Sequence, residues 1–144
     1  MKRPKRVLFV CIGNSCRSQM AEGFARVHGR GTIEPASAGI YPAMKVAPDT
    51  LQAMAEKNIN LKGQFPKNVD QVDLSKFDLI VDMSGGLMEG IQKPPVEVWD
   101  VPDPIMLEYD EHCHVRDRIE LLVKDLIREL GEKPRQVRVL GLGR

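Results

Sequence analysis

Cysteines, aromatic side chains, net charge and long hydrophobic runs are all scarce in this sequence of 144 residues. Its three cysteines are odd in number and cannot form a complete disulfide framework, so we expect a reducing compartment and at least one working thiol. A net charge of +1 offers no general attraction for nucleic acid or for a membrane surface. No stretch reaches the ~18 apolar residues of a membrane span. We therefore expect a cytoplasmic protein without a nucleic-acid or membrane partner.

The length and composition fit one domain. The hydrophobic share of 42% is ordinary for a globular protein, and splitting the chain would leave two marginal cores. We expect residues 1–144 to form a single domain. Its last part, 132–144, contains Pro134 followed by alternating Val137 and Val139, which is typical of either a flexible tail or an added edge strand.

Short apolar runs alternate with helical patterns along the chain. The runs rich in β-forming residues, each closed by turn residues, are Arg6–Val10, Thr32–Ala38, Phe77–Met83 and Val96–Trp99. The segments with helical spacing begin at Ser18, at Pro48 (with Leu51, Met54 and Ala55 as the apolar face) and at Val115, the last one ending at Leu130. This alternation predicts an α/β fold, in which helices cover both faces of a parallel sheet and make three layers.

A loop that suits a small anion follows the first predicted strand. Its residues are Cys11-Ile12-Gly13-Asn14-Ser15-Cys16-Arg17-Ser18. Such a strand-to-helix loop binds phosphate because its backbone N–H groups point inward, the next helix presents its positive end, and the Arg17 guanidinium can bind two oxygens at once. The positive electrostatic potential of these groups also favours the thiolate form of Cys11, and the Ser18 hydroxyl can donate a hydrogen bond to the Cys11 sulfur. We predict that Cys11 is a nucleophile and that residues 12–18 bind phosphate.

A general acid is also needed. Attack by Cys11 on phosphorus would give a thiophosphate enzyme intermediate, with the loop amides and Arg17 stabilising the charge on the equatorial oxygens. Asp103 follows the fourth predicted strand, and open α/β sheets gather their sites at the carboxyl ends of strands. We predict that Asp103 protonates the leaving oxygen and then activates the hydrolytic water.

At these residues the sequence resembles the low-molecular-weight protein tyrosine phosphatases and the thioredoxin-coupled arsenate reductases that share their fold. The resemblance spans nearly the whole chain. The matching motifs are Cys11 to Ser18, Ser37-Ala38-Gly39 and Asp103-Pro104. It implies a four-stranded parallel sheet of flavodoxin-like winding, Cys11 as nucleophile, Arg17 as phosphate clamp and Asp103 as acid. It also implies that Ser37 steadies the strained backbone of Asn14. We expect no cofactor and no metal.

The two branches of this resemblance differ in their use of cysteine. The runs Gln19 to Gly23 and Ser37 to Ile40 resemble the reductases. Those reductases pass oxidation to two further cysteines near the end of the third strand, and here no cysteine lies between Cys16 and Cys113. Without a resolving sulfur within reach, that intramolecular exchange cannot run. Our main interpretation is therefore a phosphate monoester hydrolase that acts on a phosphorylated protein or a small phosphate ester.

Two alternatives stay open. The first is an arsenate reductase, with arsenate as substrate, whose resolving thiol is Cys113 or an external reductant such as glutathione or mycothiol. The second is a non-catalytic binder of an oxyanion or a phosphoprotein. Cys16 either forms a protective disulfide with Cys11 under oxidation or only packs in the loop. His112 and His114 flank Cys113, but no companion residues have metal-ligand spacing, so we expect a solvated loop there.

Overall fold

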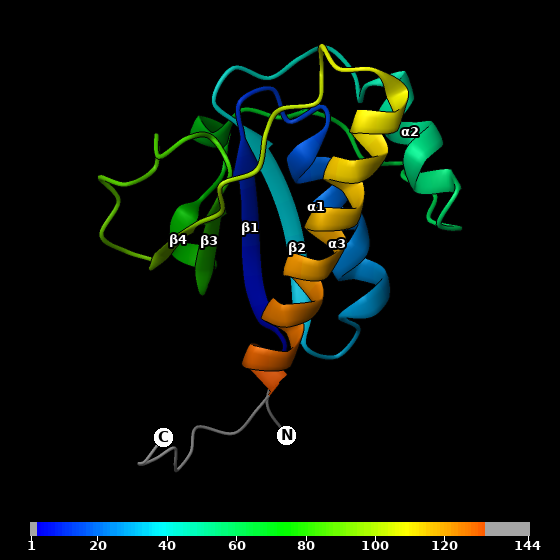
Figure 1. Ribbon diagram of the computed structural model, residues 1–144. Coiled ribbons are helices and arrows are strands. Elements are labelled where there is room, and N and C mark those ends of the chain that lie inside the picture. Colours follow the sequence, from blue (N-terminus) through cyan, green and yellow to red (C-terminus); the bar gives the residue numbers. More distant parts are fainter. Residues whose placement is uncertain (1–2, 132–144) are drawn as a thin grey trace.

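Four parallel strands form one sheet in the computed structural model, which describes residues 3–131. The strands are β1 (Lys5–Cys11), β2 (Ile33–Gly39), β3 (Leu79–Asp82) and β4 (Val96–Val98). Their order is β2-β1-β3-β4, the flavodoxin-like winding, and their carboxyl ends share the upper edge of the sheet in Figure 1. The predicted α/β fold with a four-stranded parallel sheet is thus confirmed.

The three α-helices of the described part of the chain pack on one face of this sheet. They are α1 (Arg17–His28), α2 (Pro48–Ala55) and α3 (Tyr109–Gly131). Side chains alternate between the two faces of a strand, so Val7 and Phe9 of β1 point toward these helices. There they share a core with Phe24 of α1 and Ile119 of α3. The core beneath α1 and α3 therefore fixes the start of α1, where the anion-binding loop ends.

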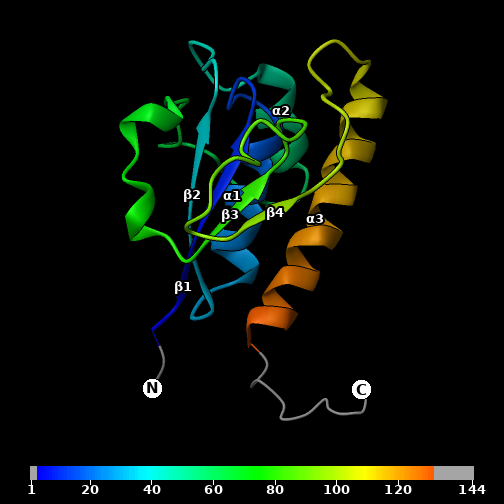
Figure 2. The same ribbon diagram turned by 90° about the vertical axis from the view of Figure 1, so that its left-hand side faces the viewer.

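Within residues 3–131, no α-helix covers the opposite face of the sheet. Leu8 and Val10 of β1 pack there against two 3-10 helices, η1 (Val69–Gln71) and η2 (Leu74–Lys76), and against Met88. In Figure 2 these segments and α3 lie on opposite sides of the sheet. Both faces are covered as we predicted, but 3-10 turns replace the helices expected on the second face. Each strand presents only one or two apolar residues on that face, and short turns are enough to cover them.

Two helices differ in detail from the sequence prediction. Helix α3 begins at Tyr109, six residues before the predicted start at Val115. Its first turn contains Asp110 and Glu111, which the positive end of a helix favours. In α2 the buried stripe is Thr50, Ala53 and Met54, whereas Leu51 and Ala55 from the predicted face are exposed. The helical spacing was right, but the buried face is shifted by one residue.

The predicted tail at 132–144 lies outside the described residues. Within residues 3–131, no helix combines the length and the apolar character that crossing a membrane requires.

We expect Ile119→Ala to lower the free energy of unfolding by about 2–5 kcal/mol, because it removes fully buried methyl groups and leaves a cavity. Denaturant-induced unfolding followed by circular dichroism measures this change. Leu121→Ala is the matched control, since Leu121 is 66% exposed on the same helix and its loss should be within about 0.5 kcal/mol. Equal losses for the two variants would contradict the packing described above.

Candidate active site

The loop that joins β1 to α1 encloses a cavity of about 260 Å³ at the carboxyl edge of the sheet. Its lining comprises Cys11, Ile12, Gly13, Ser15, Cys16, Arg17, Ala43, Asp103 and Ile105. Helix α1 begins at Arg17 with no acidic residue in its first turn, so the positive end of the helix faces the loop uncompensated. The predicted nucleophile, clamp and acid thus line one cavity, together with a field that favours an anion.

Two hydrogen-bond donors converge on the Cys11 sulfur. The backbone N–H of Asn14 lies 3.2 Å from Sγ, and the Ser18 hydroxyl lies 2.9 Å from it. Ser18 Oγ accepts a hydrogen bond of 2.6 Å from the Asn14 side-chain amide. Its own hydrogen is therefore free to point at the sulfur. Donors in this arrangement favour a thiolate over a thiol.

Asn14 has a left-handed backbone, with φ of 50°. This conformation is costly for a residue other than glycine, and persists only where the surroundings hold it. Here the side-chain amide donates to Ser37 Oγ at 3.0 Å, and its oxygen accepts from the backbone N–H of Lys67 at 3.0 Å. The Gln19 side chain donates to the backbone carbonyl of Asn14 at 2.9 Å. Ser37 therefore lies where the resemblance places a support for Asn14, next to two supports that our sequence analysis did not identify.

Ser37 is itself held by a buried carboxylate. Its hydroxyl donates to Glu22 Oε1 at 2.6 Å, and Glu22 also pairs with Arg26 one turn further along α1. The Lys67 ammonium donates to the Ser37 carbonyl at 2.9 Å. Sequence reasoning missed Glu22 and Lys67 as parts of the site. The run Gln19 to Gly23 was noticed only as a likeness, and nothing local to Lys67 signals its contacts with residues far away in the chain.

The Arg17 guanidinium is fixed by backbone carbonyls. Nη1 donates to the carbonyls of Met83, at 2.6 Å, and Val101, at 3.0 Å. Nε is buried and has no hydrogen-bond partner among the described residues. A buried donor without a partner carries a free-energy cost. An oxyanion bound in the adjoining cavity would supply the missing acceptor.

Asp103 lies across the cavity mouth from this guanidinium. Its Oδ2 is 3.4 Å from Arg17 Nη2, and its Oδ1 accepts a hydrogen bond of 3.1 Å from the backbone N–H of Ile105. The Asp103 side chain is 43% exposed, so it can exchange protons with solvent while facing the cavity. This is the arrangement that a general acid for a departing oxygen requires.

The other two cysteines have different surroundings. Cys16 lines the cavity but is almost fully buried, and burial raises the pKa of its thiol. Cys113 lies on α3, half-buried, and is not among the cavity-lining residues. Our expectation of a solvated loop around Cys113 is wrong, because that segment forms the first turns of α3 and His112 is buried. Among residues 3–131, no three potential ligand side chains gather into a metal site.

Asp82, at the end of β3, is buried on the other side of the sheet. Its carboxylate accepts hydrogen bonds from the backbone N–H groups of Ser84, at 2.8 Å, and Met88, at 3.0 Å. It therefore fixes the loop after β3.

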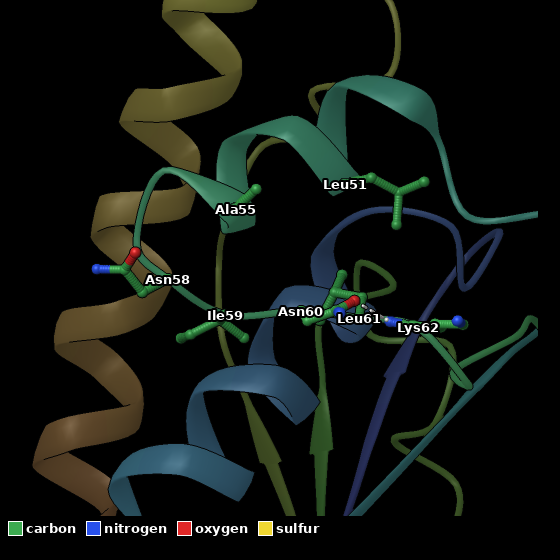
Figure 3. Close-up of a pocket in the computed structure, with 7 residues that line it drawn as sticks. All are labelled: Leu51, Ala55, Asn58, Ile59, Asn60, Leu61 and Lys62. Carbon is green, nitrogen blue, oxygen red and sulfur yellow. Dashed lines mark hydrogen bonds between the residues drawn. The ribbon is translucent and has the colours of Figure 1, made fainter.

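A larger hollow of about 570 Å³ lies between α2 and the segment 58–62 (Figure 3). Figure 3 shows Leu51 and Ala55 of α2 above Ile59 and Leu61. The hollow shares no lining residue with the Cys11 cavity and contains neither a thiol nor a carboxylate. Size alone therefore does not locate the chemistry, and the smaller cavity is the candidate active site.

The fold and the cavity together define a class of α/β proteins in which a cysteine attacks an oxyanion held by a strand-to-helix loop. The chain belongs to the low molecular weight phosphotyrosine protein phosphatase family, whose model matches residues 6–136.

Relatives from both predicted branches are similar to this chain. It is 32% identical over 134 residues to the glutaredoxin arsenate reductase of Synechocystis sp., a match that covers 88% of this chain and 99% of the relative. A solved arsenate reductase in the phosphate binding state matches with a TM-score of 0.78 and 32% identity, over 88% of this chain and 99% of that one. The low molecular weight protein tyrosine phosphatase from T. tengcongensis matches with a TM-score of 0.77 and 25% identity, over the same shares. The predicted resemblance is confirmed.

We expect Gly39→Ala to weaken the binding of inorganic phosphate by about tenfold or more, since small-to-large changes in packed sites cost ~1–3 kcal/mol. Gly39 pairs with Cys11 in the sheet, and a Cβ there would lie 2.8 Å from the Ile12 carbonyl oxygen and 2.9 Å from the Asn14 Cβ. Isothermal titration calorimetry measures the affinity. The control is Gly90→Ala, where a Cβ meets open space. Unchanged phosphate affinity in Gly39→Ala would show that the loop tolerates displacement.

Proposed function

We propose that this protein is a cysteine-dependent phosphate monoester hydrolase. One observation carries the proposal: the Asp103 carboxylate lies at the mouth of the cavity that contains Cys11, 3.4 Å from the Arg17 guanidinium. Nucleophile, anion clamp and proton donor are the complete set of groups that hydrolysis of a phosphate ester needs.

The two chemical steps follow from this geometry. In the first, the Cys11 sulfur bonds to phosphorus, the bond from phosphorus to the ester oxygen breaks, and Asp103 gives its proton to the departing oxygen. The loop amides and Arg17 hold the charge of the equatorial oxygens. In the second, Asp103 takes a proton from water, the water oxygen bonds to phosphorus, and the bond from sulfur to phosphorus breaks. Phosphate leaves and the Cys11 thiolate is restored.

The rim of the cavity supports an ester with an apolar leaving group. Ile105 lines the cavity and is 49% exposed, and the adjoining Met106 is 90% exposed. On the other side, Ala43 lines the cavity and Met44 beside it is fully exposed. Such side chains can contact a phosphorylated side chain of a protein or a small aryl ester. The free thiols of this chain suit a reducing compartment, so we place the enzyme in the cytoplasm.

A second candidate function is the reduction of arsenate. Its support is the names of the relatives: both the Synechocystis protein and the phosphate-bound structure are arsenate reductases, and the comparisons back this candidate better than hydrolysis. Cys11 would bond to arsenic with loss of hydroxide. The thiolate of an external thiol such as glutathione or mycothiol would then attack the Cys11 sulfur and form a mixed disulfide with it. The bond from sulfur to arsenic would break with its electron pair staying on arsenic, which leaves as arsenite.

We rank hydrolysis first because of the cysteines that this chain lacks. Nothing between Cys16 and Cys113 can resolve an arsenic adduct, and Cys113 lies outside the cavity lining. Cys16 is close, but burial raises the pKa of its thiol, and a thiol is a weaker nucleophile than a thiolate. Reduction would therefore need a reductant from outside the chain, whereas hydrolysis needs only water.

We expect Asp103→Ala to slow the turnover of phenyl phosphate by ~10²–10⁴ while inorganic phosphate still binds, because the acid acts on the leaving oxygen and not on the bound anion. Cys11→Ser should abolish turnover. Steady-state assays and phosphate inhibition constants measure both effects. Asp100→Ala is the matched control, since Asp100 is exposed and outside the cavity lining. If Asp103→Ala keeps the parent rate, Asp103 is not the acid.

A side-by-side assay separates the candidate functions. We expect the parent to hydrolyse aryl phosphate without added thiol, and to release no arsenite from arsenate with glutathione, mycothiol or thioredoxin. Thiol-dependent release of arsenite that disappears in Cys11→Ser would establish the second candidate, and Cys113→Ser would then show whether Cys113 takes part. Phosphate binding without turnover of either substrate would instead indicate a non-catalytic binder of an oxyanion or a phosphoprotein.

A further inference from the structure

The peptide group between Met83 and Ser84 lies between the anion clamp and a buried carboxylate. Its carbonyl accepts a hydrogen bond of 2.6 Å from Arg17 Nη1, and its N–H donates one of 2.8 Å to Asp82 Oδ1. A peptide group is planar and trans, so its C=O and its N–H point in opposite directions and turn together. Whatever holds the N–H therefore also sets the direction in which the carbonyl meets the guanidinium.

Asp82 is fully buried at the end of β3 and takes no part in the proposed chemical steps. Its carboxylate accepts three hydrogen bonds, from the Ser84 N–H, from the Ser84 hydroxyl and, at 3.0 Å, from the Met88 N–H. All three donors belong to the loop that follows the strand. Burying a carboxylate is costly unless such donors satisfy it. The carboxylate and the loop therefore hold each other in one arrangement.

The loop itself contains residues that are hard to keep in order. Gly85 and Gly86 have left-handed backbones, with φ of 88° and 96°. Glycine loses more conformational freedom on folding than any other residue, so an ordered pair of glycines needs fixed points on either side. The hydrogen bonds from Ser84 and Met88 to Asp82 lie on the two sides of this pair. Asp82 thus supplies both fixed points.

Arg17 depends on the direction of the Met83 carbonyl. Its Nη1 donates to the carbonyls of Met83 and Val101, which leaves Nη2 and the buried, unpartnered Nε for an oxyanion in the cavity. Two N–H groups of a guanidinium bind two oxygens at once only while its plane is fixed. If the peptide group turned over, the Ser84 N–H would face Nη1, and two donors would meet.

We infer that Asp82 is a positioning residue for the anion clamp: by holding the Ser84 N–H, it keeps the Met83 carbonyl on Arg17 and the guanidinium turned toward the Cys11 cavity. This inference deepens the hydrolysis proposed above and rests on it for the role of Arg17. Phosphate binding can be measured without turnover, so the inference and the hydrolase proposal can fail separately.

The first test is Asp82→Ala, which removes the carboxylate and frees the peptide group. We expect it to weaken the binding of inorganic phosphate by about tenfold, because the guanidinium no longer presents two N–H groups together. Isothermal titration calorimetry measures the affinity. Asp78→Ala is the matched control, since Asp78 lies at the amino end of the same strand and its Oδ2 accepts from the Arg6 N–H at 2.8 Å. The control should lower the thermal stability and keep the parent affinity.

A second control separates the Ser84 N–H from the Ser84 hydroxyl. Ser84→Ala keeps the peptide N–H that bonds to Asp82 and removes only the hydroxyl. We expect its phosphate affinity to stay within about threefold of the parent, because the peptide group is still held. Equal losses in Ser84→Ala and Asp82→Ala would assign the effect to the hydroxyl and overturn the inference.

A double-mutant cycle with Arg17→Lys separates positioning from a general loosening of the cavity. A lysine ammonium still attracts the anion, but it is a point charge and has no planar group to be oriented. In this background we expect Asp82→Ala to weaken phosphate binding by less than about threefold, because the two residues act as one unit. The same tenfold loss in both backgrounds would show that Asp82 does not act through Arg17.

Asp82→Asn replaces Asp82→Ala if the alanine variant does not fold. The amide keeps the volume but offers one acceptor oxygen in place of two, so the Ser84 N–H or the Met88 N–H loses its partner. We expect phosphate affinity to fall by about threefold or more. Parent affinity in the folded variant would overturn the inference and leave the proposed hydrolysis intact. Phosphate binding that depends on Asp82, in a parent that hydrolyses no ester, would contradict hydrolysis and leave the inference standing.

Discussion

At Asn14 the chain adopts a left-handed backbone, unlike any other residue of the anion-binding loop. This turn directs the Asn14 N–H to the Cys11 sulfur. Holding a residue other than glycine in such a conformation costs about 1–3 kcal/mol. The hydrogen bonds that Asn14 donates to Ser37 and accepts from Gln19 and Lys67 offset that cost. The pairing of Cys11 with Gly39 in the sheet leaves just enough room for the turn. The β1–β2 register is therefore part of the chemistry as well as of the fold.

The strand order explains why the acid arrives from a different part of the chain. Strand β1 lies between β2 and β3. The connection that follows β1 therefore runs toward one side of the sheet and the connection that follows β3 toward the other, which opens a crevice at the carboxyl end of β1. The anion-binding loop fills one side of this crevice, and the segment after β4 brings Asp103 to the other. Arg17 joins the two sides, because its guanidinium donates to carbonyls after β3 and after β4 while facing Asp103.

The sequence allowed prediction of the strands, the fold class and the grouping of Cys11, Arg17 and Asp103, because each has a local signal: an apolar run, a loop of fixed spacing, or a position after a strand. The first turns of α3 were missed because residues 109–114 are mostly polar, although His112 is buried. Glu22 and Lys67 were missed because their partners lie 15 and 53 residues away in the chain. A contact between distant segments leaves no periodic pattern that a single sequence can reveal.

Hydrolysis and arsenate reduction share their first step, the bond between the Cys11 sulfur and a tetrahedral oxyanion, and they differ in what attacks next. In the proposed hydrolysis the second attack is made by water on phosphorus, and Asp103, which lines the cavity, would activate that water. For reduction it falls on the sulfur, which is buried at 2% exposure beneath the Asn14 and Ser18 donors. Cys11 lines the cavity, so an external thiol has to enter the cavity to reach that sulfur, whereas water needs only to reach phosphorus. The burial of the Cys11 sulfur and the exposure of the Asp103 carboxylate are therefore the two features of the cavity that support the proposed hydrolysis.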